Sequence, residues 1–244
     1  MPIRVATWNV NSVRQRIDLL LSWLKECQPD IVCLQEIKCV DEAFPRLEIE
    51  ALGYNVVTHG QKTFNGVALL SKLRFDETKS GLSGDDEDAH ARFVEGVVTL
   101  KQGVVRVACL YLPNGNPANT DKYPYKLKWM SRLLEYSKER LKTEEPLILA
   151  GDFNVIPAAR DVYNPAAWTI KEGAMVGKTS SGQSQAFTKT DYSNFRLIVW
   201  SRMVNGMLWM MSGSRSARSS MSSPPSALAS SRGRPVVRSS TTAA

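Results

Sequence analysis

Four apolar stretches of this sequence end in residues whose side chains carry an oxygen-containing group. Asn9 follows IRVATW, Glu36 follows IVCLQ, Tyr111 ends VACLY, and Asp152 and Asn154 lie in LILAGDFN. Carboxylate and amide oxygens suit Mg²⁺, which prefers one or two carboxylates and keeps its waters for a phosphate. A tyrosine hydroxyl beside such a metal can steady a phosphate oxygen or a leaving group. These residue types therefore predict metal-dependent chemistry at a phosphate.

Each of these residues also has a purely structural explanation. Asn9 and Asn154 are residue types that commonly form turns at strand ends. Glu36 alone could be a salt-bridge partner, and Tyr111 could form the rim of a core. Only their combination at several strand ends favours a shared site on a rigid scaffold.

The apolar pattern predicts the elements that position these side chains. Helices are expected at 14–27, which has an apolar face, and at 125–142. A Lys-Gln-Gly turn predicts antiparallel pairing of the two strands around it. Strands mixed with helices favour an α/β or α+β sandwich. The expected strands are 3–8, 31–35, 54–59, 67–71, 93–100, 104–111 and 147–152.

Composition narrows the class of protein. The chain has 244 residues, enough for one large domain or two ordinary ones. No run approaches the roughly 18 apolar residues of a membrane span, and Met1 leads directly into a strand-like stretch. We therefore expect a soluble, cytoplasmic protein without a membrane partner. Four cysteines without Cys-x-x-Cys spacing favour reduced thiols over a zinc or disulfide framework.

The sequence changes character near residue 168. Residues 169–244 contain ten Lys/Arg and two Asp/Glu, a net charge of +8, whereas residues 1–168 contain 21 and 22, a net charge of −1. From residue 212 onward, twelve serines in 33 residues predict disorder. We divide the chain into an organised domain, 1–168, and an unpatterned Ser/Arg-rich segment, 169–244. This segment is predicted to be disordered or read out of frame.

Several motifs in the first 168 residues resemble the exonuclease III family of abasic-site endonucleases, within the endonuclease/exonuclease/phosphatase superfamily. QE and GDFN occur across the superfamily, whereas GYNVVTHGQKTFNGVALLSK and LPNGNP resemble its DNA-repair branch. The resemblance implies a four-layer sandwich of two mixed β-sheets flanked by helices, with its second half incomplete here. The other matching stretches are WNVNSVRQR, PDIVCLQEIK, GDDEDAHARFVEG, KYPYKLKWM and LAGDFNVIP.

The resemblance also implies an activity in DNA base excision repair. Family members hydrolyse the phosphodiester 5′ to an abasic site in double-stranded DNA, using Mg²⁺, with Mn²⁺ as a possible substitute. They also have 3′-to-5′ exonuclease and 3′-phosphatase activities. Arg92 lies where the family places a basic residue near DNA. The expected partners are therefore abasic duplexes and 3′ ends, bound by a monomer.

Roles for the strand-end residues follow from the same resemblance. Glu36 matches the principal metal-binding carboxylate, and Asn9 lies in the same metal site. Asp152 matches the residue that activates or protonates a group at the scissile phosphate. Asn154 matches the phosphate-orienting amide, and Tyr111 matches the active-site tyrosine. The predicted metal ligands are Asn9, Glu36, Asp152 and Asn154, and the predicted catalytic residues are Tyr111, Asp152 and Asn154.

The sequence departs from the family beyond residue 168. Family members continue with an Arg-Ile-Asp segment and with a Ser-Asp-His segment whose histidine completes the site, and neither occurs here. His59 and His90 are the only histidines, and both are expected to make local hydrogen bonds. We therefore expect impaired activity. We also expect apolar inner faces, such as that of 147–150, to lack the cover of a second sheet.

Other interpretations stay open at this point. The chain could be a catalytically dead DNA-binding remnant whose Arg/Ser segment gives salt-sensitive affinity. It could be a broken gene product without activity. A phosphatase of the same superfamily acting on a small molecule or a lipid is the enzymatic alternative.

Overall fold

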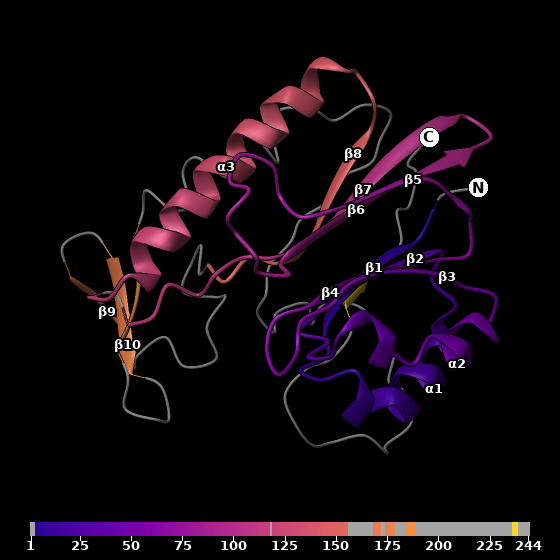
Figure 1. Ribbon diagram of the computed structural model, residues 1–244, viewed down its shortest axis with the longest axis horizontal. Helices are drawn as coiled ribbons and strands as arrows, with labels where there is room; N and C mark the ends of the chain where they lie inside the picture. Colours follow the sequence, from indigo (N-terminus) through magenta and orange to yellow (C-terminus); the bar gives the residue numbers. More distant parts are fainter. Residues whose placement is uncertain are drawn as a thin grey trace.

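The computed structural model describes residues 3–117 and 119–155 in full, and only the backbone of four further strands (Figure 1). The four are β9 (Trp168–Lys171), β10 (Ala174–Lys178), β11 (Ser184–Thr188) and β12 (Val236–Arg238). The fully described elements are β1 (Val5–Asn9), η1 (Arg14–Arg16), α1 (Ile17–Cys27), β2 (Ile31–Gln35), η2 (Asp41–Ala43), α2 (Arg46–Glu50), β3 (Asn55–His59), β4 (Val67–Ser71), β5 (Phe75–Ser80), β6 (Phe93–Leu100), β7 (Gly103–Tyr111), α3 (Lys122–Lys142) and β8 (Leu147–Asp152).

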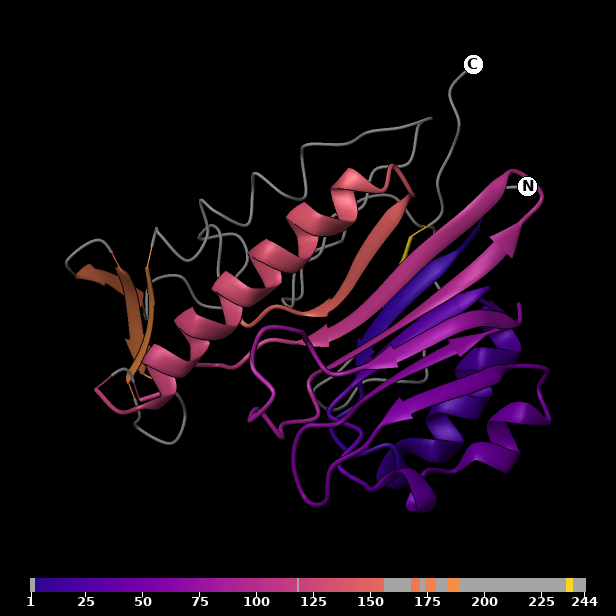
Figure 2. The same ribbon diagram turned by 45° about the horizontal axis from the view of Figure 1, so that its top comes forward.

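Two mixed sheets form the centre of the molecule. Sheet A has the strand order β12-β1-β2-β4-β3, and sheet B has the order β5-β6-β7-β8. In each sheet one pair is parallel, β1 with β2 and β7 with β8, while the other pairs are antiparallel. The sheets lie face to face, with α1 and α2 outside sheet A and α3 outside sheet B (Figures 1 and 2). The fold is the four-layer α/β sandwich that the resemblance implied.

The alternation of side chains along the strands explains these layers. Successive residues of a strand point to opposite faces, so each strand contributes to two cores. The inner core between the sheets contains, among others, Val5, Cys33, Leu69, Val94, Val107 and Ile148. The outer core beneath α1 and α2 contains, among others, Trp8, Leu20, Leu24, Val32, Ile49 and Leu70.

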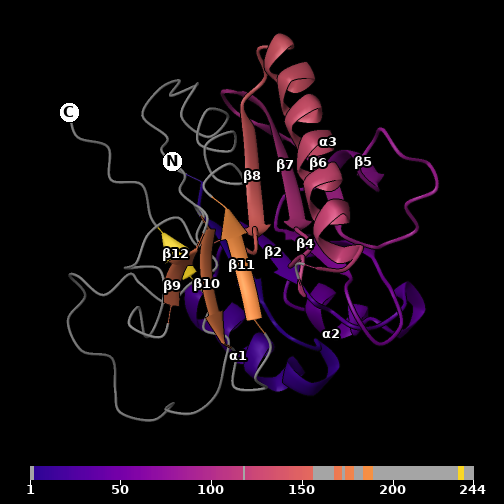
Figure 3. The same cartoon turned by 90° about the vertical axis from the view of Figure 1, so that its left-hand side faces the viewer.

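The long helix α3 covers the outer face of sheet B and runs beside β7 and β8 (Figure 3). Trp129 and Leu133 are 1% and 0% exposed and pack with Phe93 and Leu110 of the sheet. Burying each such side chain is worth roughly 1.5–3 kcal/mol, so α3 is a permanent part of the fold. Because α3 leads directly into β8, its packing also places the strand that carries Asp152.

Most elements match the sequence predictions. Strands 31–35, 67–71, 93–100 and 147–152 are confirmed at both ends, and the Lys-Gln-Gly turn joins β6 and β7 in an antiparallel hairpin. The predicted helix at 14–27 begins with the 3-10 turn η1. The sequence analysis missed the short helix α2 and the strand β5, whose residues after Phe75 are all exposed and so carry no apolar alternation.

The expected exposure of the inner face of 147–150 is wrong. Ile148 and Ala150 are 4% and 2% exposed and lie in the inner core, because every strand of the two sheets except β12 is built by residues before 155. The apolar pattern also did not predict β9, β10 and β11, which form an antiparallel sheet. Apart from these strands and β12, residues 169–244, which were predicted to be disordered, lie outside the described residues.

Two further expectations concern the class of protein. None of the helices in the described residues combines the length and apolar character that crossing a bilayer requires. Cys27, Cys33, Cys39 and Cys109 are free thiols, and all but Cys27 are buried. Burial raises the pKa of Cys39 to about 11, which keeps this thiol protonated and unreactive.

Candidate active site

The two parallel strand pairs bring the predicted site residues to one edge of the sandwich. In sheet A the pairing of β1 with β2 sets Asn9 beside Gln35. In sheet B the pairing of β7 with β8 sets Tyr111 beside Asp152. Parallel strands end on the same side of a sheet, so each pair delivers two neighbouring residues. Glu36 follows Gln35 with a φ of +54°, where the chain leaves the strand.

Hydrogen bonds join the strand ends into one cluster across the two sheets. The Asn9 amide Nδ2 donates to Glu36 Oε1 at 2.8 Å and to Asp152 Oδ2 at 3.0 Å. The Tyr111 hydroxyl donates to the same Glu36 Oε1 at 3.0 Å. All four residues are partly exposed. The cluster thus contains two carboxylates that are bridged by one amide group, and an external ligand can reach it.

Asn154 joins this cluster through the main chain. Its backbone N–H donates to Asp152 Oδ1 at 3.0 Å, and its side-chain Nδ2 donates to Leu112 O at 2.7 Å. The chain reverses here, because Asn154 has a φ of +47° in the left-handed region that asparagine tolerates. Asn154 is therefore a turn residue and a neighbour of Asp152 at the same time, and its role at a phosphate stays a prediction.

Arg92 lies directly against Tyr111. Its guanidinium carbon is 4.9 Å from the centre of the Tyr111 ring, and its Nη1 donates to Tyr111 O at 3.2 Å.

The two histidines make the local contacts that we expected. His59 Nδ1 lies 3.0 Å from Phe93 O, and His90 Nδ1 lies 3.5 Å from the Asn65 side-chain amide.

The two carboxylates have different electrostatic surroundings. Burial raises the pKa of Glu36, but the hydrogen bonds from Asn9, Lys38 and Tyr111 and the charge of Lys38 outweigh it, so this pKa lies below its ordinary value. Burial raises the pKa of Asp152 above its ordinary value, with the Glu36 charge acting in the same direction. Two neighbouring carboxyl groups whose pKa values are shifted in opposite directions suit different tasks. One can serve as a permanent anion and the other can take part in proton transfer.

The donor set fits a hard divalent cation such as Mg²⁺. Nowhere in residues 3–117 and 119–155 do three or more His, Cys, Asp or Glu side chains converge, so a zinc-type site is not formed there. Glu36 and Asp152 supply the two carboxylates with which Mg²⁺ is commonly held. Asn9 turns its amide nitrogen toward both carboxylates, while its Oδ1 accepts from Asn11 N at 3.1 Å. In this arrangement Asn9 fixes the carboxylates in place.

The sequence analysis missed two lysines at the site. Lys38 Nζ lies 2.9 Å from Glu36 Oε2. Lys38 follows the QE motif, but no sequence pattern marks it as a site residue. Lys126 is 0% exposed, and its Nζ donates to Asn154 O at 2.9 Å. It lies on the amphipathic helix α3, where a lysine is ordinarily assigned to the solvent-facing side. No sequence pattern indicated that it is buried, because its burial comes from the close approach of the LPNGNP loop, where a Cβ at Gly115 would lie 2.8 Å from Lys126 Cδ.

A comparison with known protein families identifies the group to which this fold and site belong. Residues 6–203 match the model of the endonuclease/exonuclease/phosphatase family. The chain belongs to this family. The match continues beyond residue 168, and our domain boundary at that residue stays a prediction.

Relatives within the family point to its exonuclease III and AP endonuclease branch. The chain is 35% identical over 161 residues to exodeoxyribonuclease III of Haemophilus influenzae, which is 66% of this chain and 60% of that relative's length. The solved 3′ phosphatase NExo from Neisseria, bound to a product DNA hairpin, superposes with a TM-score of 0.69 at 29% identity, covering 80% of this chain and 70% of the other. An AP endonuclease from Archaeoglobus fulgidus superposes with a TM-score of 0.67 at 30% identity, covering 80% and 69%. The chain is thus a member of a DNA-repair nuclease family.

Proposed function

We propose that this chain is a phosphodiesterase of the exonuclease III type that cuts double-stranded DNA 5′ to abasic sites and removes nucleotides from 3′ ends. The observation that carries this proposal is the cluster in which Asn9 links the Glu36 and Asp152 carboxylates beside the Tyr111 hydroxyl. The family relatives supply the class of substrate. We further propose that the protein acts as a monomer in the cytoplasm.

The residues of the cluster divide the chemistry among them. Glu36 holds Mg²⁺, or Mn²⁺ in its place, and the metal when bound supplies Lewis acidity at the phosphate. Asp152 takes the proton from the attacking water or gives one to the leaving oxygen. The Tyr111 hydroxyl and the Asn154 amide orient the phosphate, and Arg92 contacts the DNA backbone. We also propose that Asp152 and Asn154 contribute oxygen ligands to the metal.

We propose that the activity is weak in comparison with complete family members. The family's catalytic histidine has no counterpart in this sequence, since His59 and His90 make local contacts elsewhere. Losing one positioned acid–base group typically lowers a rate by about 10²–10⁴-fold. The remaining groups still bind and polarise a phosphate, so the metal-dependent rate stays above background.

Incision of a duplex oligonucleotide with one abasic site tests this proposal. We expect cutting 5′ to the site in Mg²⁺ and none in EDTA, because the carboxylates cannot polarise the phosphate without a cation. An Asp152→Ala preparation, purified in parallel, controls for host nuclease. Equal cutting by both preparations would mean that the chain has no activity of its own. Salt-sensitive binding without cutting would instead support the dead DNA-binding interpretation.

A second prediction concerns the metal. Lys38 Nζ sits 2.9 Å from Glu36 Oε2 and opposes a cation there. We expect Lys38→Met to bind Mn²⁺ about tenfold more tightly, since a unit charge a few ångströms away is worth more than 1 kcal/mol in this surrounding. Titration monitored by electron paramagnetic resonance measures the change, and Lys79→Met on the exposed strand β5 is the matched control. Equal affinity in Lys38→Met and wild type would remove Glu36 from the metal site.

A further inference from the structure

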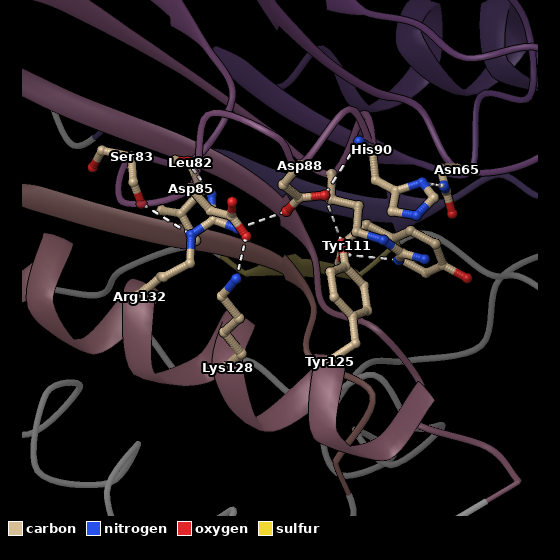
Figure 4. A network of polar contacts seen from close by, with 11 residues as sticks. Asn65, Leu82, Ser83, Asp85, Asp88, His90, Tyr111, Tyr125, Lys128 and Arg132 are labelled. Carbon is tan, nitrogen blue, oxygen red and sulfur yellow. Dashed lines mark hydrogen bonds and ion pairs between the residues drawn. The ribbon is translucent and has the colours of Figure 1, made fainter. Parts of the chain in front are cut away.

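Four consecutive acidic residues, 85–88, occur in the loop that joins β5 to β6. We call residues 81–92 the acidic loop. Arg92 is its last residue, and the loop lies against α3 (Figure 4). Such a run of negative charge beside a surface proposed to bind DNA opposes that binding. Some of these charges must therefore be held and compensated by the protein.

Arg132 of α3 binds the acidic loop at four points, one of which is a longer ion pair of 3.9 Å between its Nη1 and Asp85 Oδ2. Its Nη1 lies 2.6 Å from Asp88 Oδ2, its Nε donates to Ser83 O at 3.1 Å, and its Nη2 donates to Leu82 O. The ion pair is buried, since the Arg132 and Asp88 side chains are only 8% and 5% exposed. A buried pair of this kind is sensitive to loss of either partner, because the other charge is left uncompensated.

Asp88 extends this anchor toward the site. Its Oδ1 accepts from the Tyr125 hydroxyl at 2.9 Å and from His90 N at 3.3 Å. The Tyr125 and His90 rings meet edge to face at 5.5 Å. Two residues further on, Arg92 O accepts from Tyr111 N at 2.8 Å, and the Arg92 guanidinium covers the Tyr111 ring. A continuous series of contacts thus joins Arg132 to Tyr111, as Figure 4 shows.

We propose that the Asp88–Arg132 ion pair positions Arg92 against Tyr111 and thereby sets the geometry of the active site. Asp88 and Arg132 are positioning residues, because their contacts run to the loop, to α3 and to Tyr125 and not to the reacting atoms. The pair also compensates the charge of one acidic side chain of the loop. The inference rests on the proposed function in that Arg92 and Tyr111 are taken to act on DNA.

Replacing Asp88 with asparagine tests the ion pair. The variant keeps the size of the side chain but leaves the Arg132 guanidinium with neutral acceptors at that position. We expect kcat/KM for incision to fall about 10- to 100-fold, because small displacements of positioning groups have large effects on rate. Asp86→Asn makes the same change of charge at an exposed position of the same loop, and its kcat/KM should not fall below that of wild type, because removing an exposed negative charge cannot weaken DNA binding.

A double-mutant cycle separates positioning from a general loss of structure. If Asp88 acts through Arg92, Asp88→Asn will have little further effect in an Arg92→Ala background. Effects that multiply independently would overturn the inference. Should Asp88→Asn fold poorly, Tyr125→Phe carries the same test, since it removes only the hydroxyl that Asp88 accepts. Tyr125→Phe is likewise expected to have little further effect in the Arg92→Ala background.

A measurement without DNA keeps this inference distinct from the proposed function. In the wild-type chain the Nε resonance of Arg92 should show a restrained side chain in ¹⁵N relaxation, and in Asp88→Asn it should show rapid averaging. Unchanged relaxation would overturn the positioning role even if the chain cuts DNA. Changed relaxation in a chain that does not cut would support the positioning role while the proposed function fails.

Discussion

Asp152→Asn is expected to lower the Mg²⁺-dependent incision rate by about 10²–10⁴-fold while the chain remains folded. The amide keeps the shape of the side chain, and its single oxygen can still accept one of the two hydrogen bonds that Asp152 receives on separate oxygens, from Asn9 and from the Asn154 backbone. It cannot accept a proton from water or present an anionic oxygen to a metal. Because Asp152 is a carboxylate beside Glu36, its neutralisation should leave the melting temperature unchanged or raise it.

The incision assay and a thermal melt of the same preparation check both parts of this expectation. Asp18→Asn on the exposed side of α1 makes the same change of charge outside the site, and its rate should equal that of wild type. A variant that keeps more than about a tenth of the wild-type rate would remove Asp152 from the chemistry. A lower melting temperature together with a lower rate would assign the residue a structural role.

Gly151→Ala is expected to destabilise the fold by about 3 kcal/mol or more and to abolish incision with it. A Cβ at Gly151 would lie 1.9 Å from Leu110 O and 2.8 Å from Leu110 C. These are backbone atoms of the neighbouring strand, to which β8 is hydrogen-bonded at this residue pair. The clash cannot be relieved by a side-chain rotation, so β8 must move away from β7 at the residue before Asp152.

Urea unfolding of the full chain measures this effect. Gly53→Ala is the matched control, because Gly53 has a φ of +83° and a Cβ there would meet nothing within 4 Å. It should cost only about 1 kcal/mol from the left-handed backbone. Equal midpoints for the two variants would show that β7 and β8 can separate freely, and the close approach would then have no role in holding Asp152.

The strands that are buried on both faces were predicted more accurately from the sequence than the other strands. The strands 31–35 and 67–71 are entirely buried and stand out as apolar runs, whereas β5 has five exposed residues in succession and no apolar signal. A helix was predicted at 125–142, three residues short of the observed start at Lys122. Burial, and not strand propensity alone, determined which elements could be found.

The site was predictable in its residue types but not in its connections. Glu36, Tyr111 and Asp152 could be found because each ends a strand and matches a family motif. That Asn9 would bridge the two carboxylates with its nitrogen depends on how the two sheets meet, which no local pattern encodes. The role of Arg132 was hidden for the same reason, because its partners lie 44 to 50 residues away in an irregular loop.

The link between Asn9 and Asp152 spans 143 residues of sequence. Contacts between distant segments form slowly in folding, because the loop between them must be closed before they stabilise the chain. Each sheet can acquire its own strand pairing first, but the cluster exists only after the sheets have docked. During refolding, catalytic competence should therefore return after the secondary structure, as one of the last properties that the molecule regains.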